Sequence, residues 1–214
     1  MERLHIFDHP LIHHKISYLR DKNTKSGDFR NLVEELSLLM AFEVLSDLPT
    51  YAISVETPLA VAECQRVHEE GVVIVPILRA GLGMVPGFQK LLPFARVGHI
   101  GLARNKETHE PEAYYYKMPQ GAENATVIVV DPMLATGGSA CDAIAHLKEQ
   151  GMHHLKFVCL IASKDGIARL QSEHPDVDIY AAECDAELND DAYIVPGLGD
   201  AGDRIFGTRK TLLV

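Results

Sequence analysis

A candidate ligand-binding loop lies in residues 126–139, TVIVVDPMLATGGS, where an acid, hydroxyl side chains and paired glycines accompany an apolar run. Thr126 to Val130 is β-branched throughout and predicts a buried strand. Ser139 to Gln150 predicts an amphipathic helix that ends at Gly151. The turn between a strand and a helix N-terminus is a frequent place for anions to bind.

Two glycines and one acid give this loop its chemistry. Gly137 and Gly138 lack the Cβ that would keep a phosphate away from the backbone, and the first-turn N–H groups and the helix dipole point to the same place. Asp131, at the strand end, is placed to accept hydrogen bonds from sugar hydroxyls. The pattern predicts a phosphate at residues 136–139, although a purely structural turn also needs glycines and remains the alternative.

A second strand–loop–helix unit spans Val72 to Met84, VVIVPILRAGLGM. The Arg79 guanidinium can hold a diphosphate through several directed N–H bonds, and the small residues after it let backbone N–H groups come close. A dinucleotide fold is the alternative interpretation of GLGMVPG. Its glycine spacing and Pro86 within the first helical turns argue against that fold.

A polar segment, residues 104–119, follows the predicted strand Val97–Ala103 and reads RNKETHEPEAYYYKMP. The segment is too polar to belong to the core. Tyrosines 114–116 fit ordinary strand residues of a solvated hairpin. Arg104 opens the segment and, with Arg79, can give a positive cleft to a chain that is acidic overall.

The C-terminal tail, Tyr193 to Thr208, reads YIVPGLGDAGDRIFGT. It contains Gly-x-Gly-x-x-Gly, but no βαβ unit follows, which argues against a dinucleotide site. A glycine-rich turn exposes backbone N–H and C=O groups, and these suit the alternating donors and acceptors of a pyrimidine edge. A purely structural glycine tail is the alternative.

Composition restricts the class of protein. A chain of 214 residues with 47% hydrophobic residues suits one well-filled domain, residues 1–214. The formal net charge of −10 argues against a nucleic-acid partner. The longest apolar runs have strand length, which argues against a membrane span.

Four cysteines, Cys64, Cys141, Cys159 and Cys184, are widely separated and form no Cys-x-x-Cys pair. We expect reduced thiols and a cytoplasmic protein. No histidine or cysteine spacing typical of zinc is present, and residues Asp176 and Asp178 fit solvated carboxylates on one strand face better than a metal pair.

The order of elements indicates an α/β fold. Short β-rich runs alternate with helical stretches 81–92, 139–150 and 164–173, which predicts a mostly parallel sheet flanked by helices. The expected strands are Val72–Ile77, Val97–Ala103, Thr126–Val130, Leu155–Ala162 and Val177–Ala182. Two helices, His9–Arg20 and Ser26–Leu45, precede this pattern as core helices or as an interface, and Tyr51–Val55 is expected to pair with part of Leu59–Arg66.

The segment Asp-Pro-Met-Leu-Ala-Thr-Gly-Gly-Ser resembles the diphosphoribosyl-binding loop of type I phosphoribosyltransferases. It differs from many of them in Pro132, which stands where they have a second acid. Together with ILRAGLGM and YIVPGLGDAGDRIFGT, it makes nearly the whole chain similar to the uracil phosphoribosyltransferase family.

This resemblance implies a type I phosphoribosyltransferase fold with N-terminal helices in 8–46, a core in 72–183 and a uracil-binding hood in 190–208. It implies a glycosyltransferase of pyrimidine salvage that converts uracil and 5-phospho-α-D-ribose 1-diphosphate (PRPP) to UMP and diphosphate. It also implies a loop after Arg104 that closes over the site during turnover.

The resemblance assigns residues as follows. PRPP contacts fall on Arg79, Arg104, Asp131, Pro132, Met133, Leu134, Ala135, Thr136, Gly137, Gly138, Ser139 and Asp200, of which Arg79, Arg104 and Asp131 are catalytic. Uracil contacts fall on Tyr193, Ile194, Gly199, Asp200 and Ala201.

Mg²⁺ is expected to arrive with PRPP rather than in a protein cage. A homodimer or larger homo-oligomer and a GTP effector are further implications of the family. Two alternatives remain: a regulator that keeps this fold and binds RNA, and a transferase for another base such as a purine.

Overall fold

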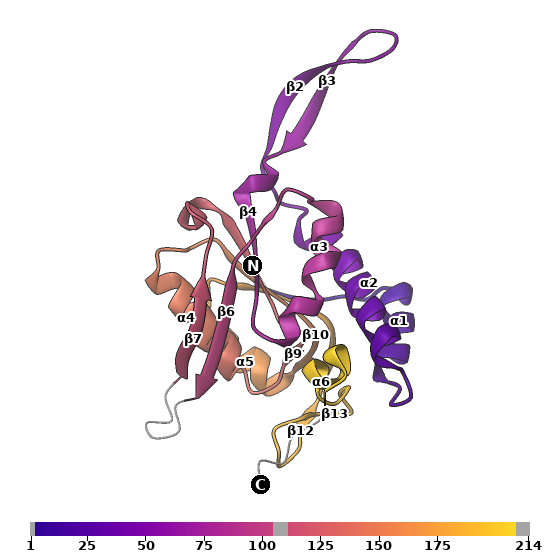
Figure 1. The fold of residues 1–214 in the computed structure, drawn as a ribbon, viewed down its shortest axis with the longest axis vertical. Coiled ribbons are helices and arrows are strands. Elements are labelled where there is room, and N and C mark those ends of the chain that lie inside the picture. The colour runs from indigo at the N-terminus through magenta and orange to yellow at the C-terminus, as the bar shows by residue number, and fades with distance from the viewer. Residues whose placement is uncertain (1–2, 105–110, 209–214) are drawn as a thin grey trace.

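A computed structural model describes residues 3–104 and 111–208. Its centre is a seven-stranded parallel sheet with strand order β1–β11–β10–β8–β4–β5, in which β9 also pairs with β10 (Figure 1). The expected α/β class is confirmed. The strands are β1 (Leu4–Ile6), β4 (Val72–Pro76), β5 (Arg96–Val97), β8 (Thr126–Val130), β9 (Met133–Leu134), β10 (Leu155–Ser163) and β11 (Asp178–Asp185).

Alternate residues of each central strand enter two separate cores. Ile128 and Val130 pack with helices α1 (Pro10–Arg20), α2 (Ser26–Val44) and α3 (Val85–Leu91) on one face. Val127 and Val129 pack with α4 (Gly138–Glu149) and α5 (Lys164–Glu173) on the other. Because both faces are covered, the central strands β4, β8 and β10 are mostly apolar, with Lys156 of β10 as a buried charged exception. Short 3₁₀ helices occupy Glu69–Gly71, Ala80–Gly83 and Ala122–Asn124.

The long helix α2 is a core helix. Phe29, Val33, Leu36 and Met40 recur at helical spacing and are all fully buried. This confirms the interpretation of α2 as a core helix. No helix in the described ranges has both the length and the hydrophobicity that a membrane crossing requires.

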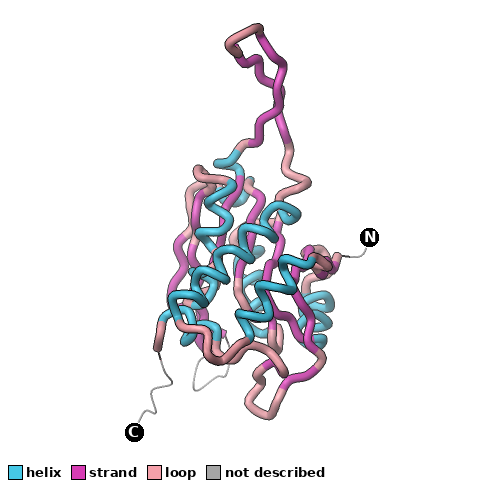
Figure 2. The backbone as a smooth tube through the Cα atoms, turned by 90° about the vertical axis from the view of Figure 1, so that its right-hand side faces the viewer, coloured by secondary structure: helices cyan, strands magenta, loops and turns pink. Residues whose placement is uncertain are grey.

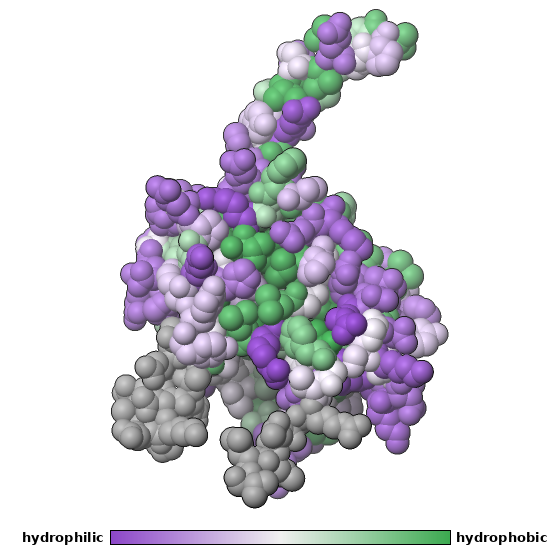
Figure 3. Space-filling view, viewed as in Figure 1, coloured by the Kyte–Doolittle hydropathy of each residue, from purple (hydrophilic) through white to green (hydrophobic). Residues whose placement is uncertain are grey.

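A two-stranded arm projects from this body. β2 (Thr50–Glu56) pairs antiparallel with β3 (Val61–Val67), as expected, and both strands extend away from the sheet and helices (Figures 1 and 2). The surface of the arm mixes apolar and polar residues (Figure 3), and Leu59 near its tip is 97% exposed.

The predicted strand Val97–Ala103 is wrong as a single strand of the parallel sheet. The chain forms β5, leaves the sheet at Gly98, and continues as β6 (His99–Arg104), which pairs antiparallel with β7 (Pro111–Lys117). The Met118 side chain packs against Gly98, so a larger residue there would have to displace it. The sequence of a β-rich run does not indicate whether the strand will join the parallel sheet or pair antiparallel with the next strand.

The solvated hairpin predicted for this segment is present. Tyr114 and Tyr115 are exposed strand residues of β7. The turn of the hairpin, and with it part of the expected closing loop, lies outside the described residues.

A C-terminal unit completes the fold at the carboxyl edge of the sheet, where ligands of such sheets bind. It consists of β12 (Glu187–Leu188), β13 (Ile194–Val195) and α6 (Ala201–Phe206). Figure 1 shows it beside α2 and below the ends of β9 and β10.

Candidate functional site

The loop after β8 turns sharply into α4. Gly137 occupies the N-cap of this helix with a left-handed backbone, φ +78°, a conformation that glycine adopts without strain. The Thr136 hydroxyl accepts a hydrogen bond from the Gly138 N–H at 3.4 Å. Thr136 and Ser139 are exposed, so hydroxyl groups and helix N–H groups stand together at the surface. The arrangement is that of an anion-binding cradle.

The N-terminus of α5 holds this loop in place. The Ser163 hydroxyl donates to the Ala135 carbonyl at 2.5 Å and accepts from the Gly166 N–H at 2.9 Å. A Cβ at Gly166 would lie 2.5 Å from the same carbonyl, so only glycine permits the approach. The loop is therefore fixed from behind before any ligand binds.

Met133 and Leu134 form the short strand β9, which pairs with Ile161 and Ala162 of β10. The Pro132 carbonyl accepts from the N–H groups of Leu160 and Ile161. The first half of the predicted phosphate loop is thus an ordered extension of the sheet, and its second half faces outward.

Asp131 directly follows β8. Its N–H donates to the Val158 carbonyl, and its Oδ1 accepts from the Met133 N–H at 3.3 Å. Burial raises the pKa of Asp131 to about 7, and the Met133 hydrogen bond offsets part of that effect. A carboxylate with a perturbed pKa at a strand end is a common feature of functional sites.

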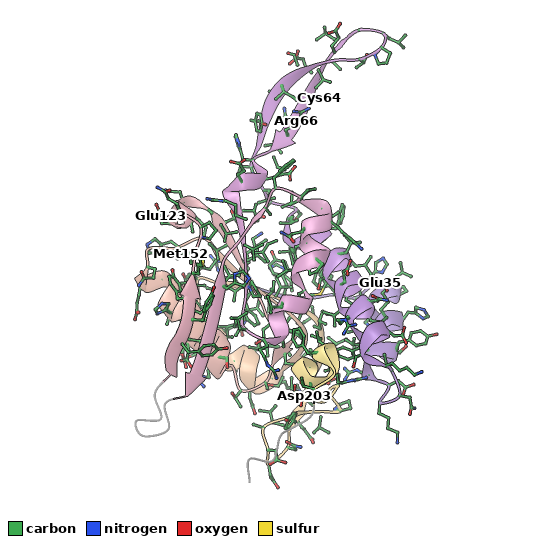
Figure 4. All side chains as sticks on the ribbon, viewed as in Figure 1. Glu35, Cys64, Arg66, Glu123, Met152 and Asp203 are labelled. Carbon is green, nitrogen blue, oxygen red and sulfur yellow. The ribbon has the colours of Figure 1, made fainter. Side chains whose placement is uncertain are left out.

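The loop of Arg79 meets the first loop through Gly81. A Cβ at Gly81 would collide with the Val130 carbonyl, immediately before Asp131, so the two turns are in backbone contact. Arg79 itself remains 58% exposed, and its Nη2 lies 3.6 Å from Oδ1 of Asp203. The guanidinium therefore contacts α6, the helix on which Figure 4 labels Asp203.

Arg104 ends β6, opposite Pro111 in the register with β7. The Leu78 N–H donates to the Ile100 carbonyl at 2.8 Å, which joins β6 to the loop of Arg79. The ribbon that carries Arg104 is thereby connected to the candidate site, and the contact of its side chain with diphosphate stays a prediction.

The predicted hood residues lie on consecutive turns. Ile194 is buried, and the Tyr193 N–H donates to the Asn189 side chain at 2.8 Å. Gly199 has φ +80° with open space around its Cα. Asp200 caps α6 by accepting from the Asp203 N–H at 2.8 Å. Its second carboxylate oxygen has no hydrogen bond among the described residues.

Hydrogen bonds among Arg20 at the end of α1, Asp185 and Gly197 connect this helix to the hood. This set of contacts, called the brace below, was not predicted from the sequence. Arg20 donates to both carboxylate oxygens of Asp185, at 2.7 and 2.8 Å, and to the Gly197 carbonyl at 2.8 Å. Asp185 also accepts from the Gly197 N–H at 2.9 Å. Arg204 donates to backbone carbonyls of Leu19 and Leu198. These partners are separated by up to 185 residues, so no spacing in the sequence indicates them.

One group of potential metal ligands occurs within residues 3–104 and 111–208: Cys141, Glu173 and His174. His174 Nδ1 lies 3.3 Å from Lys148 Nζ and its Nε2 lies 3.0 Å from the Cys141 carbonyl, so both ring nitrogens are occupied. Burial raises the pKa of the Cys141 thiol to about 12. This group does not suit a hard cation, which prefers oxygen ligands.

A family model described as uracil phosphoribosyltransferase matches residues 6–208. A uracil phosphoribosyltransferase from Lysinibacillus sphaericus is 55% identical over 209 residues, covering 98% of this chain and 100% of that protein. One from Bacillus cytotoxicus is 54% identical over the same coverage.

The chain belongs to the uracil phosphoribosyltransferase family. A solved structure of a protein from Aquifex aeolicus, with 36% identity, superimposes with a TM-score of 0.89 and covers 97% of this chain and 100% of that one. In this uracil phosphoribosyltransferase family member, the loops of Asp131 and Arg79 and the C-terminal unit lie at the carboxyl edge of the sheet. The structure brings the loops of Asp131 and Arg79 together and adds Asp203, which the sequence prediction did not include.

Proposed function

We propose that this protein transfers the 5-phosphoribosyl group of PRPP to uracil, releasing diphosphate and forming UMP in pyrimidine salvage. The observation that carries the proposal is the backbone contact between Gly81 and Val130. It brings residues 136–139 and the Asp131 carboxyl next to the loop of Arg79, whose side chain is 58% exposed, in a chain that matches the family from residue 6 to residue 208.

The proposed chemistry is electrostatic. Arg79 and Arg104 neutralise the departing diphosphate, Asp131 orients the ribose hydroxyls, and residues 136–139 hold the 5-phosphate. Cleavage of the bond between the sugar and diphosphate generates positive charge on the sugar, and the nearby carboxylate stabilises that charge. Positioning of two substrates, rather than a covalent nucleophile, supplies the rate enhancement.

Mg²⁺ belongs to the proposal as a partner of the PRPP diphosphate. The residues at the carboxyl edge fit a cation shared with the substrate, because they offer separate carboxylates rather than a cluster. When bound, the ion would neutralise diphosphate oxygens. Asp131 and Asp200 are the carboxylates placed to contact the hydrated ion or the sugar.

The hood supports uracil as the acceptor. Gly199 exposes its backbone in the left-handed region, and Asp200 and Ala201 continue the same turn. Backbone N–H and C=O groups read the order of donors and acceptors on a base edge. Such a surface discriminates among bases by hydrogen-bond pattern and size.

A base panel tests this function. The protein is incubated with PRPP, Mg²⁺ and one of uracil, cytosine, adenine, guanine or hypoxanthine, and diphosphate release is measured. Uracil alone is expected to support release. Release with a purine and not with uracil would contradict the proposal, and an RNA mobility shift without any transfer would favour the regulator instead.

Oligomerisation, a GTP effector and a cytoplasmic location are part of the same proposal. The arm supports self-association, because Leu59 and Val61 are exposed on a ribbon too thin to have a core of its own. The GTP effector has only the family resemblance behind it, so the base panel is run with and without GTP. The cysteines are free thiols, including the exposed Cys184, which fits a reducing compartment.

Light scattering checks the oligomeric state. Leu59→Asp is expected to shift the mass toward a single chain, whereas Tyr18→Asp, an exposed apolar residue of α1, leaves it unchanged. A single-chain mass for the unsubstituted protein contradicts self-association.

A further inference from the structure

An arginine of α5 lies beside the phosphate cradle. A Cβ placed on Gly138 would lie 3.3 Å from Arg169 Nη1 and 3.6 Å from Thr136 Oγ1. A Cβ on Gly137 would lie 3.3 Å from Arg169 Cβ and 3.4 Å from its Cδ. The Arg169 side chain therefore runs along both glycines, and its guanidinium reaches the same point as the Thr136 hydroxyl.

Glu173 forms a hydrogen bond with one edge of the Arg169 guanidinium. Arg169 Nε donates to Glu173 Oε1 at 2.7 Å, one helical turn along α5. This hydrogen bond lowers the pKa of Glu173. An arginine has five N–H donors, so the two Nη groups remain available for a second anion.

Contacts between α5 and the loop of Ala135 hold the Arg169 side chain beside the cradle. The Ser163 hydroxyl and Gly166 tie the helix N-terminus to Ala135 of the loop. Arg169 follows Gly166 by three residues and so faces the same side of α5. The cation is thus carried by a rigid element that is anchored to the cradle itself.

The cradle is otherwise supplied by uncharged groups, namely backbone N–H groups and the hydroxyls of Thr136 and Ser139. A phosphate group carries up to two negative charges, and a guanidinium can donate two parallel N–H bonds to its oxygens. Asp142, on the first turns of α4, adds negative charge nearby, and Arg169 offsets it.

We infer that Arg169 binds the 5-phosphate of the sugar substrate and of the nucleotide product, with Glu173 orienting its guanidinium. This inference rests on the proposed function, since it concerns the phosphate end of that substrate. It separates the two ends of PRPP: Arg79 serves the diphosphate, and Arg169 serves the 5-phosphate.

Calorimetry with two probes tests the inference. Ribose 5-phosphate carries only the 5-phosphate end, and diphosphate carries only the other. Arg169→Ala is expected to weaken ribose 5-phosphate binding about tenfold and to leave diphosphate binding within about twofold. Arg169→Lys is expected to recover part of the loss, because lysine retains the charge and loses the paired donors.

Steady-state kinetics give a second readout that a purely structural role would not produce. The KM for PRPP is expected to rise with Arg169→Ala while the KM for uracil and the melting temperature stay constant. Lys15→Ala is the matched control, because it removes one positive charge and one ion pair, with Glu35, on the other face of the sheet.

Calorimetry distinguishes failure of the inference on Arg169 from failure of the proposed function. Equal binding of ribose 5-phosphate by Arg169→Ala and the unsubstituted protein would overturn the inference and leave the proposed function intact. Failure of the unsubstituted protein to bind PRPP or ribose 5-phosphate at all would overturn both.

Discussion

The Arg79 guanidinium lies 3.6 Å from the Asp203 carboxylate, which joins the candidate diphosphate loop to helix α6 of the hood. The Asp203 Oδ1 also accepts from the Thr208 hydroxyl at 2.5 Å, and its N–H donates to Asp200. A diphosphate that binds Arg79 would therefore share the guanidinium with this carboxylate or displace it. This ion pair is one of the contacts that link the loop of Arg79 to α6.

Removing this competing charge should strengthen PRPP binding. Asp203→Asn keeps an oxygen that can accept from Thr208 and removes the negative charge beside Arg79. Because the pair is partly exposed, its contribution is about 1 kcal/mol or less, so the KM for PRPP is expected to fall up to about fivefold. Initial-rate kinetics measure it. Asp191→Asn makes the same charge change on an exposed hood residue, and an equal fall in that control would contradict the specific role of Asp203.

Asp131 should give the pH profile its acidic limb. Its pKa of about 7 means that the carboxylate ionises only as the pH passes through 7. Since kcat/KM reports ionisations of the free enzyme, kcat/KM for PRPP is expected to rise through this range. Asp131→Asn should abolish that limb and lower turnover on the order of 100-fold. A rising limb that persists in Asp131→Asn would assign it to another group.

The raised pKa of Asp131 should also make the stability of the folded protein depend on pH. A raised pKa means that the folded protein holds the Asp131 proton between about pH 4 and pH 7, where the unfolded chain has lost it. The stability contributed by protonated Asp131 is present below pH 4 and is lost as the pH rises through 7. Asp131→Asn should therefore unfold at higher denaturant concentration than the parent at pH 8, with a smaller difference at pH 4. The reverse order would contradict the burial of this carboxyl.

The left-handed turn at Gly137 should matter for binding as well as stability. Gly137→Ala combines a left-handed alanine, which costs about 1–2 kcal/mol, with close contacts to Gly166 and Arg169. Gly121→Ala is a matched control, because Gly121 has φ +76° and open space around it, away from the site. Thermal denaturation should show a loss in both variants, and calorimetry should show weaker PRPP binding only in Gly137→Ala. Equal binding by both would contradict the cradle.

The brace between Arg20 and Asp185 should hold the uracil hood. Asp185→Ala removes a largely buried carboxylate that accepts from Arg20 and from the Gly197 N–H. The free energy of unfolding is expected to fall by about 3 kcal/mol, and the KM for uracil to rise more than the KM for PRPP. Glu35→Gln, which breaks the exposed pair with Lys15, should cost less than about 1 kcal/mol. Denaturant titration and kinetics measure both effects.

Local sequence determined the parts of the fold whose causes lie within a few residues. The strand before Asp131, the helix over residues 164–173 and the glycine turn into α4 follow from β-branched runs, helical periodicity and backbone freedom. These signals also placed Asp131, Gly137 and Gly138 at the carboxyl edge of a parallel sheet, since that edge is fixed by the alternation of strands and helices.

The tertiary structure alone decided which distant groups meet. Four features depend on packing between segments that share no periodic pattern. They are the edge strand β1, the ribbon of β6 and β7, the pairing of Arg20 with Asp185, and the approach of Arg169 to Gly138. From the sequence alone, a charged side chain on the polar face of a helix is predicted to be solvated. Only the tertiary structure shows which groups it contacts. The amino-acid sequence thus specified the loops of Asp131 and Arg79, and the packing of α1, α5 and α6 specified which charged side chains lie near that edge of the sheet.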